Sequence, residues 1–167
     1  MVFNYEERPL IETEIIFFGH VPSEKNSKRI VWIDGRPSIA SSEAYERWEA
    51  DELPTLVGTL VLYPPYKIVL TIFSGTLRAE DNGNKSESIH DLLVHAGIIE
   101  DDNWFGLVET TQKFGGVDIV NPRIEVVITS ADEAVTIAEL KAPLILVVKA
   151  QRKEISKNKR RQKKGFL

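Results

Sequence analysis

The stretch Tyr66–Ala96, YKIVLTIFSGTLRAEDNGNKSESIHDLLVHA, decides the fold because it joins a strand pattern to a helix pattern. Its first part, Tyr66–Ser74, is rich in β-branched and aromatic residues, which favour an extended strand. Asn84–Ala96 repeats its apolar side chains with the period of a helix, and Gly97 follows where helices commonly end. A second strand is predicted at Gly106–Gln112, so we expect a strand–helix–strand unit.

Shorter elements are predicted on the N-terminal side of this unit. Thr13–Gly19 has the composition of a strand. Arg29–Ile33 and Arg36–Ala40 flank Asp34-Gly35, a strong signal for a two-residue hairpin turn. A helix is expected to begin after Ser41 or Ser42 and to stop before Pro54.

On the C-terminal side we expect Arg123–Thr129 to pair antiparallel with Gly106–Gln112, the two strands being joined through Gly115-Gly116. Ala131–Leu140 and Pro143–Lys153 are predicted as two helices. The predicted class is α+β, with a mixed or antiparallel sheet flanked by helices. We expect one domain over residues 1–150 and a basic tail over residues 151–167.

Charge is strongly segregated along the chain. From Lys149 onward there are nine basic side chains and one acidic one, whereas residues 1–148 carry 12 basic and 24 acidic side chains. A basic end can bind phosphate backbones without reading sequence. Composition alone favours a solvated tail.

Composition also removes several classes of protein. The chain has no cysteine, which excludes disulfides, a thiolate nucleophile and a zinc ribbon. No apolar run approaches eighteen residues, so we expect no membrane span. The acidic start MVFNYEERPL is unlike a secretory signal peptide, and we expect a cytoplasmic protein.

The predicted helix has one acidic face. A helical wheel groups Asn84, Glu87, Ser88, Asp91 and His95 in one arc, opposite Ile89, Leu92, Leu93 and Ala96. Glu87 and Asp91 are four residues apart, and like charges at that spacing destabilise an isolated helix by about a few tenths of a kcal/mol. Either both carboxylates are solvated or a cation lies between them.

Further carboxylates flank this helix. Asp81 precedes it, and Asp101 and Asp102 follow the turn at Gly97. A strand–helix–strand path can bring these groups toward one end of the sheet. Mg²⁺ prefers oxygen ligands and commonly takes one or two carboxylates together with water and phosphate. Spacing alone does not separate a metal site of this kind from a solvated acidic surface.

Three motifs follow one another along the chain, in residues 19–29, 81–102 and 114–128. Together they resemble motifs of the RusA-type Holliday-junction resolvases of bacteria and their phages. Residues 19–29, GHVPSEKNSKR, are similar to the family's Pro-Ser-x-Asn loop. Residues 81–102, DNGNKSESIHDLLVHAGIIEDD, match the family's acidic motifs without gaps, and residues 114–128, FGGVDIVNPRIEVVI, resemble its Gly-Gly hairpin and last strand. The resemblance covers about Ile15 to Thr129.

The resemblance implies a Mg²⁺-dependent homodimer, with Mn²⁺ as an alternative ion, that cuts four-way DNA junctions and needs no organic cofactor. Asp81 and Asp102 stand at the family's first and last catalytic aspartates, Asp101 is the neighbouring acid, and Asp91 matches the helix aspartate. The implied metal ligands are Asp81, Glu87, Asp91 and Asp102.

Two positions depart from the family pattern. Gly83 replaces the second catalytic aspartate, and Glu87 stands at the position of the catalytic lysine. Glu87 could supply the missing carboxylate, with Lys85 taking the role of the lysine; Lys85 is equally well read as a surface lysine. Alternatively the site has decayed and only DNA binding remains.

Residues of the loop that resembles the family's DNA-contacting entry are candidates for phosphate contact, or else simply solvated: Lys25, Asn26, Lys28 and Arg29. The tail residues Lys159, Arg160 and Arg161 are further candidates. We expect His90 and His95 on the surface, and Trp32 and Trp48 in the core or at a dimer interface.

These observations give one hypothesis and two rivals. The hypothesis is hydrolysis of phosphodiester bonds in branched DNA during recombination and repair. The rivals are a catalytically silent junction-binding protein of phage origin, and an interaction protein whose acidic helix docks a basic partner.

Overall fold

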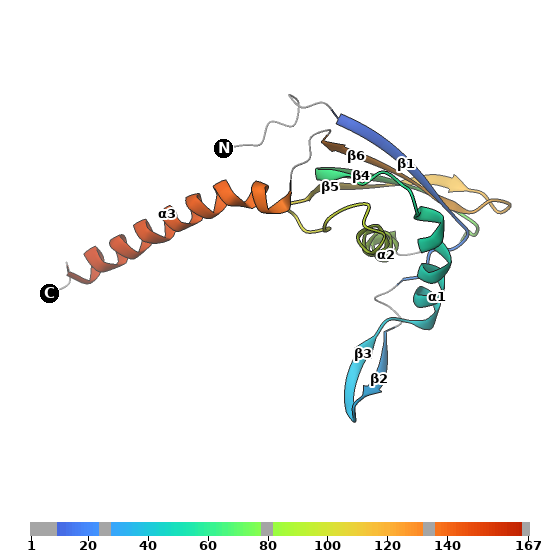
Figure 1. Cartoon of the computed structure of the whole chain (residues 1–167), viewed down its shortest axis with the longest axis horizontal. Helices are drawn as coiled ribbons and strands as arrows, with labels where there is room; N and C mark the ends of the chain where they lie inside the picture. The colour runs from blue at the N-terminus through green and yellow to red at the C-terminus, as the bar shows by residue number, and fades with distance from the viewer. Residues whose placement is uncertain (1–9, 24–27, 78–81, 132–135, 165–167) are drawn as a thin grey trace.

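The computed structural model describes residues 10–23, 28–77, 82–131 and 136–164 (Figure 1). Its main sheet has four strands, β1 (Leu10–Phe18), β4 (Tyr63–Ser74), β5 (Leu107–Val117) and β6 (Arg123–Ala131), in the order β1-β6-β4-β5. A separate hairpin consists of β2 (Arg29–Ile33) and β3 (Arg36–Ala40). The helices are α1 (Glu43–Glu52), a short 3₁₀ turn η3 (Leu53–Leu56), α2 (Asn82–His95) and α3 (Ile137–Lys164). The fold is α+β, as predicted.

The strand–helix–strand unit is present, and its two strands are parallel. Tyr66 pairs with Leu107 near the start of both strands, and α2 provides the crossover between them. β6 pairs antiparallel with both β4 and β1. The predicted antiparallel pairing of Gly106–Gln112 with Arg123–Thr129 is therefore wrong: β6 lies between β1 and β4 and buries apolar side chains there, whereas β5 is an edge strand.

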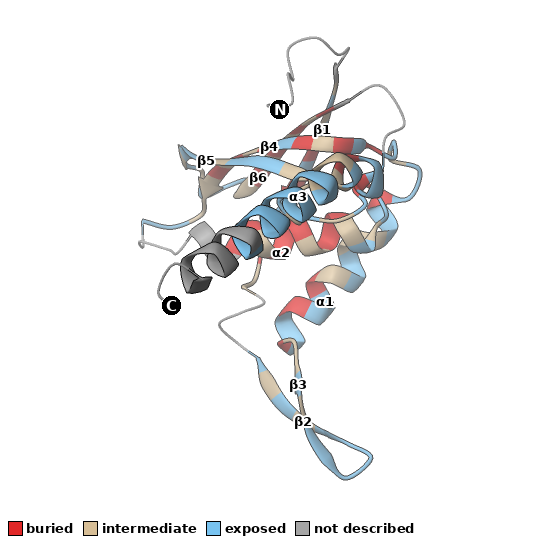
Figure 2. Ribbon diagram, turned by 90° about the vertical axis from the view of Figure 1, so that its left-hand side faces the viewer, coloured by how far each residue is buried: buried red, intermediate tan, exposed pale blue. Residues whose placement is uncertain are grey.

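The core lies between the sheet and α2. Ile89, Leu92 and Leu93 of the helix are fully buried and belong to one apolar cluster with alternate residues of β4 and β6, which include Ile68 and Val126. Burial of each such side chain contributes roughly 1.5–3 kcal/mol. In both views, α1 and α2 lie on the same side of the sheet (Figures 1 and 2). The predicted apolar face of α2 is thus confirmed.

The β2–β3 hairpin extends from the sheet and helices beyond α1 (Figure 1). Its turn residues Asp34 and Gly35 have φ of 49° and 74°, as a two-residue turn of this type requires. The Arg29 guanidinium contacts Glu43 at 2.7 Å and Glu46 at 2.6 Å, which ties the hairpin to α1. Trp32 is 72% exposed and is not a core residue, whereas Trp48 is buried as expected.

The two helices predicted at Ala131–Leu140 and Pro143–Lys153 are wrong. Ala131 ends β6, and one helix, α3, runs from Ile137 through Pro143 to Lys164. Proline lacks an amide N–H and so removes one helical hydrogen bond, but the flanking residues continue the helix. Most of α3 projects away from the sheet (Figure 1). In the part of the chain that the structure describes, no helix is long and apolar enough to cross a membrane.

Candidate acidic site on helix α2

Helix α2 buries polar side chains as well as apolar ones. Ser86 accepts a hydrogen bond from the Gln112 side chain (2.8 Å), and His90 lies 3.5 Å from the Thr110 hydroxyl, so this face of α2 contacts β5. Ser88 is fully buried and donates a hydrogen bond to the Pro22 carbonyl (2.8 Å). The helix therefore packs against the sheet, including its edge strand β5, and against the loop after β1.

This enclosure corrects two expectations from the helical wheel. Ser88 was placed on a polar arc with Glu87 and Asp91, and His90 was expected on the surface; both Ser88 and His90 are buried. The wheel reports direction around one helix and does not include neighbours that arrive from elsewhere in the chain. The small size of Ser86 and Ser88 was the available signal, because serine permits a strand or loop to approach a helix closely.

Glu87 and Asp102 lie near the same buried imidazole. Burial lowers the pKa of His90, and the negative charges of Asp102 and Glu87 act in the opposite direction. Both carboxylates are thus close enough to influence one ring, although fifteen positions separate them in the chain. Glu87 is half-buried, and its Oε2 atom is shielded from solvent.

The other predicted acids have different surroundings. Asp101 forms a local turn, in which its side chain accepts hydrogen bonds from the backbone N–H of Asn103 (3.1 Å) and from the Asn103 amide (2.5 Å). Asp91 is half-buried on α2. Asp81 lies outside the described residues. Of the predicted acids, Glu87 and Asp102 therefore act by their charge on His90, while Asp101 has a turn-forming role.

The position of Asp101 and Asp102 also differs from the expectation that all flanking acids meet at one end of the sheet. Because β4 and β5 are parallel, α2 begins at the end of the sheet where β4 finishes. Asp101 and Asp102 precede the start of β5, which is the opposite end. The charge of Asp102 nevertheless acts on His90, which lies in the second half of α2.

Tyr66 fixes the loop that carries these aspartates. Its hydroxyl accepts a hydrogen bond from the Glu100 N–H (3.0 Å) and lies 3.5 Å from the Leu62 carbonyl oxygen. Burial, helped by the charges of Glu100 and Asp101 and opposed by the Glu100 hydrogen bond, raises the pKa of Tyr66 to about 12. Nothing in the sequence pattern singled out this contact, because it joins residues 34 positions apart.

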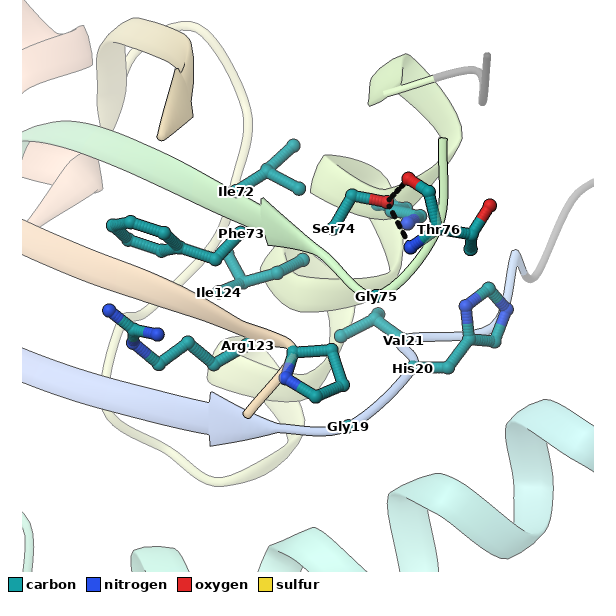
Figure 3. Close-up of a pocket in the computed structure, with 12 residues that line it drawn as sticks. Gly19, His20, Val21, Ile72, Phe73, Ser74, Gly75, Thr76, Arg123 and Ile124 are labelled. Carbon is teal, nitrogen blue, oxygen red and sulfur yellow. Dashed lines mark hydrogen bonds between the residues drawn. The ribbon is translucent and has the colours of Figure 1, made fainter. Parts of the chain in front are cut away.

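Lys85 is 8% exposed and lines a small pocket at the end of β4, so the interpretation of a surface lysine is wrong. The pocket has a volume of about 120 Å³ and is bordered by the ends of β1 and β4 and by the start of β6 (Figure 3). The Ser74 hydroxyl bonds to the backbone of Thr76 at its rim. Lysine is rarely buried unless it is paired or has a function.

The oxygen atoms of these carboxylates are the type of ligand that a hard divalent ion prefers. Among the residues that the structure describes, no three His, Asp or Glu side chains form a group that could hold a metal ion. Glu87 and Asp102 do provide two carboxylates in one region, and Mg²⁺ sites commonly use one or two together with water and substrate phosphate. Oxygen donors of this type suit Mg²⁺ or Mn²⁺.

The predicted DNA-contacting residues fall in three places. Lys25 and Asn26 lie outside the described residues, and Lys28 is exposed at the base of the hairpin. Arg29 instead has a structural role, since its guanidinium bonds to Glu43, Glu46 and the Ser41 carbonyl. Lys159, Arg160 and Arg161 belong to the distal part of α3.

No family model matches this chain, and no curated protein matches it either.

Proposed function

We propose that this protein is a divalent-metal-dependent endonuclease that hydrolyses phosphodiester bonds in branched DNA, such as Holliday junctions, during recombination and repair. The observation that carries the proposal is that the half-buried Glu87 of α2 and the exposed Asp102 of the loop before β5 both act by their charge on the buried His90 ring. Two carboxylates from separate elements, held beside a packed helix, are what a phosphate-processing metal site requires.

In this proposal Glu87 and Asp102 would hold the ion, with Asp91 as a further ligand; Asp81, which the resemblance also implies as a ligand, lies outside the described residues. These carboxylates would hold Mg²⁺ at the site, where the ion would lower the pKa of water and offset negative charge on the phosphate. Lys85, the lysine of the same helix, is buried beside the end of β4, and its positive charge would offset part of the negative charge of these carboxylates. Tyr66 and Glu100 position the loop that carries Asp102.

The net charge of residues 1–148 opposes DNA binding, since 24 acidic side chains face 12 basic ones. The proposal therefore requires a local positive path. Lys28 near the hairpin and the basic end of α3 are the candidates for this path. The resemblance to RusA-type resolvases supports both the reaction and a homodimer, whose two-fold symmetry matches that of a four-way junction.

The test is incision of a labelled synthetic four-way junction in Mg²⁺ and in Mn²⁺. Asp81→Asn, Glu87→Gln and Asp102→Asn are each expected to lower the incision rate by at least about a hundredfold, the usual cost of one electrostatic contact to a transition state. Asp51→Asn, which changes an exposed carboxylate on α1, is the matched control and is expected to retain the full rate.

Two results would overturn the proposal. Tight junction binding with no incision in either metal would favour a silent binding protein, a reading that Gly83 at a family aspartate position already raises. Incision that survives both Asp81→Asn and Asp102→Asn would place the chemistry elsewhere. Folding of each variant is checked by circular dichroism.

A further inference from the structure

The projecting part of α3 begins with five consecutive large apolar residues, Leu144–Val148. Leu146 is 68% exposed, and Ile145, Val147 and Val148 are exposed as well. Successive helical residues point about 100° apart, so five of them cover every side of the helix. A helix that is apolar all round is normally buried. In Figure 2 the turns of α3 that precede its grey end are coloured mostly as exposed.

The root of α3 is fixed to the rest of the fold. Ile137 and Leu140 are buried, and Glu100 Oε2 accepts a hydrogen bond from the Ile137 N–H (2.9 Å). The Lys141 ammonium lies 4.8 Å from the centre of the Phe105 ring. The direction of the projecting part, Leu144–Lys164, is therefore set by these contacts; we call this part the arm.

Charge indicates what covers the arm. Residues from Lys149 onward carry nine basic side chains and one acidic one, whereas residues 1–148 have twice as many acidic side chains as basic ones. A second copy of this chain offers both surfaces that the arm lacks: an identical apolar segment and an acidic surface. A nucleic acid would pair with the basic end but would leave Leu144–Val148 uncovered.

We propose that the arms of two copies pair antiparallel, crossing near Leu146, and that the basic end of each lies beside the partner's acidic Glu100–Asp102 loop. The orientation follows from charge. Parallel pairing would place the two basic ends side by side, where they repel, whereas antiparallel pairing separates them and directs each toward an acidic surface.

Helix lengths are consistent with this reach. From Leu146 to Lys164 the arm extends about 27 Å, and from Leu146 back to Ile137 it extends about 14 Å, at a rise of about 1.5 Å per residue. In an antiparallel pair centred at Leu146, the last roughly 13 Å of each arm therefore passes alongside the partner's fold. This overlapping portion contains most of the basic residues.

A second exposed apolar site lies beside the start of α3, where the arm of the partner would pass. Trp104 is 76% exposed and stacks on Phe105, with 4.3 Å between ring centres, at the root of α3. An antiparallel pair centred at Leu146 places Ile155 opposite the partner's Ile137, close to the partner's Trp104. Ile155 is itself exposed on the arm of a single copy. Pairing would cover both residues.

This inference deepens the proposed function, and its consequence for the site rests on that function. Each candidate site would receive basic residues from the other copy, beside the loop that carries Asp102. Those cations would supply the positive path that the acidic fold lacks. DNA would then be held between the site of one copy and the arm of the other.

The first test is sedimentation equilibrium of the full chain without DNA. We expect a dimer, with the dissociation constant raised at least about a hundredfold by Leu146→Glu, since the change places a charge on both sides of the pair. Val57→Glu adds the same charge at another exposed apolar residue, away from α3, and is expected to leave the dimer intact. A monomer at all concentrations, or equal dimerisation of both variants, would overturn the proposal.

The second test addresses orientation. Because the chain has no cysteine, Ser156→Cys gives a single spin-labelling position on each arm. Antiparallel pairing centred at Leu146 predicts a label-to-label distance of about 30 Å along the axis, whereas parallel helices would hold the labels about 10 Å apart. A distance near 10 Å would refute the antiparallel arrangement.

These measurements separate the two proposals, because neither uses DNA or metal. A dimer with the expected spin-label distance that cuts no junction would keep the arm pairing and reject the nuclease. Incision by a monomer would reject the arm pairing and keep the nuclease.

Discussion

Replacing Tyr66 by phenylalanine tests how the loop before the acidic site is held. The Tyr66 side chain is fully buried, and its hydroxyl accepts the Glu100 N–H hydrogen bond at 3.0 Å. Tyr66→Phe keeps the ring in the core and removes only the oxygen. The Glu100 N–H then loses its acceptor, which costs about 1–3 kcal/mol of the free energy of unfolding near neutral pH.

The same substitution has a distinct signature at high pH. The pKa of Tyr66 is about 12 in the folded protein and about 10 in the unfolded chain. Because the folded-state pKa is the higher one, this contribution to stability is complete below pH 10 and is lost as pH rises toward 12. Two pKa units correspond to about 3 kcal/mol.

The stability curves of the two proteins should therefore converge as the solution becomes alkaline. At pH 8 the wild type is expected to be more stable than Tyr66→Phe by about 1–3 kcal/mol. Toward pH 12 the wild type loses about 3 kcal/mol that the variant does not lose, so the difference vanishes or reverses. Other tyrosines and lysines titrate in both proteins and cancel in the comparison.

Urea unfolding followed by circular dichroism between pH 8 and 12 provides the measurement. Tyr63→Phe, which changes a more exposed tyrosine at the start of β4, is the control and should follow the wild-type curve. Parallel curves for wild type and Tyr66→Phe across the whole range would refute the reasoning. Equal stability of the two proteins at pH 8 would show that the Glu100 contact contributes nothing.

Three further predictions concern the surroundings of α2. Ser88→Ala is expected to lower the free energy of unfolding by about 1–3 kcal/mol in urea unfolding, because the Pro22 carbonyl loses its buried donor; an unchanged midpoint would contradict this. Gly106→Ala should cost about 1–3 kcal/mol in thermal unfolding, since an added Cβ would lie 3.0 Å from the Asp101 carbonyl oxygen; a stabilised variant would show that the site has room. Asp102→Asn in metal-free buffer should lower the pKa of His90 further in an NMR titration, since Asp102 raises it; an unshifted midpoint would mean that Asp102 does not approach the ring.

The local sequence was sufficient to predict the bounds of an element wherever a turn or capping residue fixes the backbone conformation there. The Asp34-Gly35 turn supplies two residues with positive φ, so the bounds of β2 and β3 follow from the sequence. Ser42 accepts a hydrogen bond from the Tyr45 N–H at 3.0 Å, which begins α1 at the predicted place. Gly97 has φ of 70°, as expected just beyond the end of α2.

Pairing between distant segments was not determined in this way. Gly115-Gly116 suggested a hairpin between neighbouring strands, yet β6 lies between β1 and β4, where its alternate residues Ile124, Val126 and Ile128 are buried. That position depends on how much apolar surface each possible neighbour can cover. Such a comparison involves the whole sheet and is not contained in a window of adjacent residues.

The features of the candidate site also divide into those that helical spacing predicts and those that depend on tertiary packing. Sequence by itself determined that α2 carries Glu87 and Asp91 on one side and Ile89, Leu92 and Leu93 on the other, because helical geometry fixes direction from spacing alone. Only the tertiary structure decided that Lys85 and His90 are buried and that the charges of Asp102 and Glu87 act on the same ring. These features depend on β5 and the loop after β1 closing around α2, and burial, unlike spacing, is a property of what the rest of the chain brings alongside.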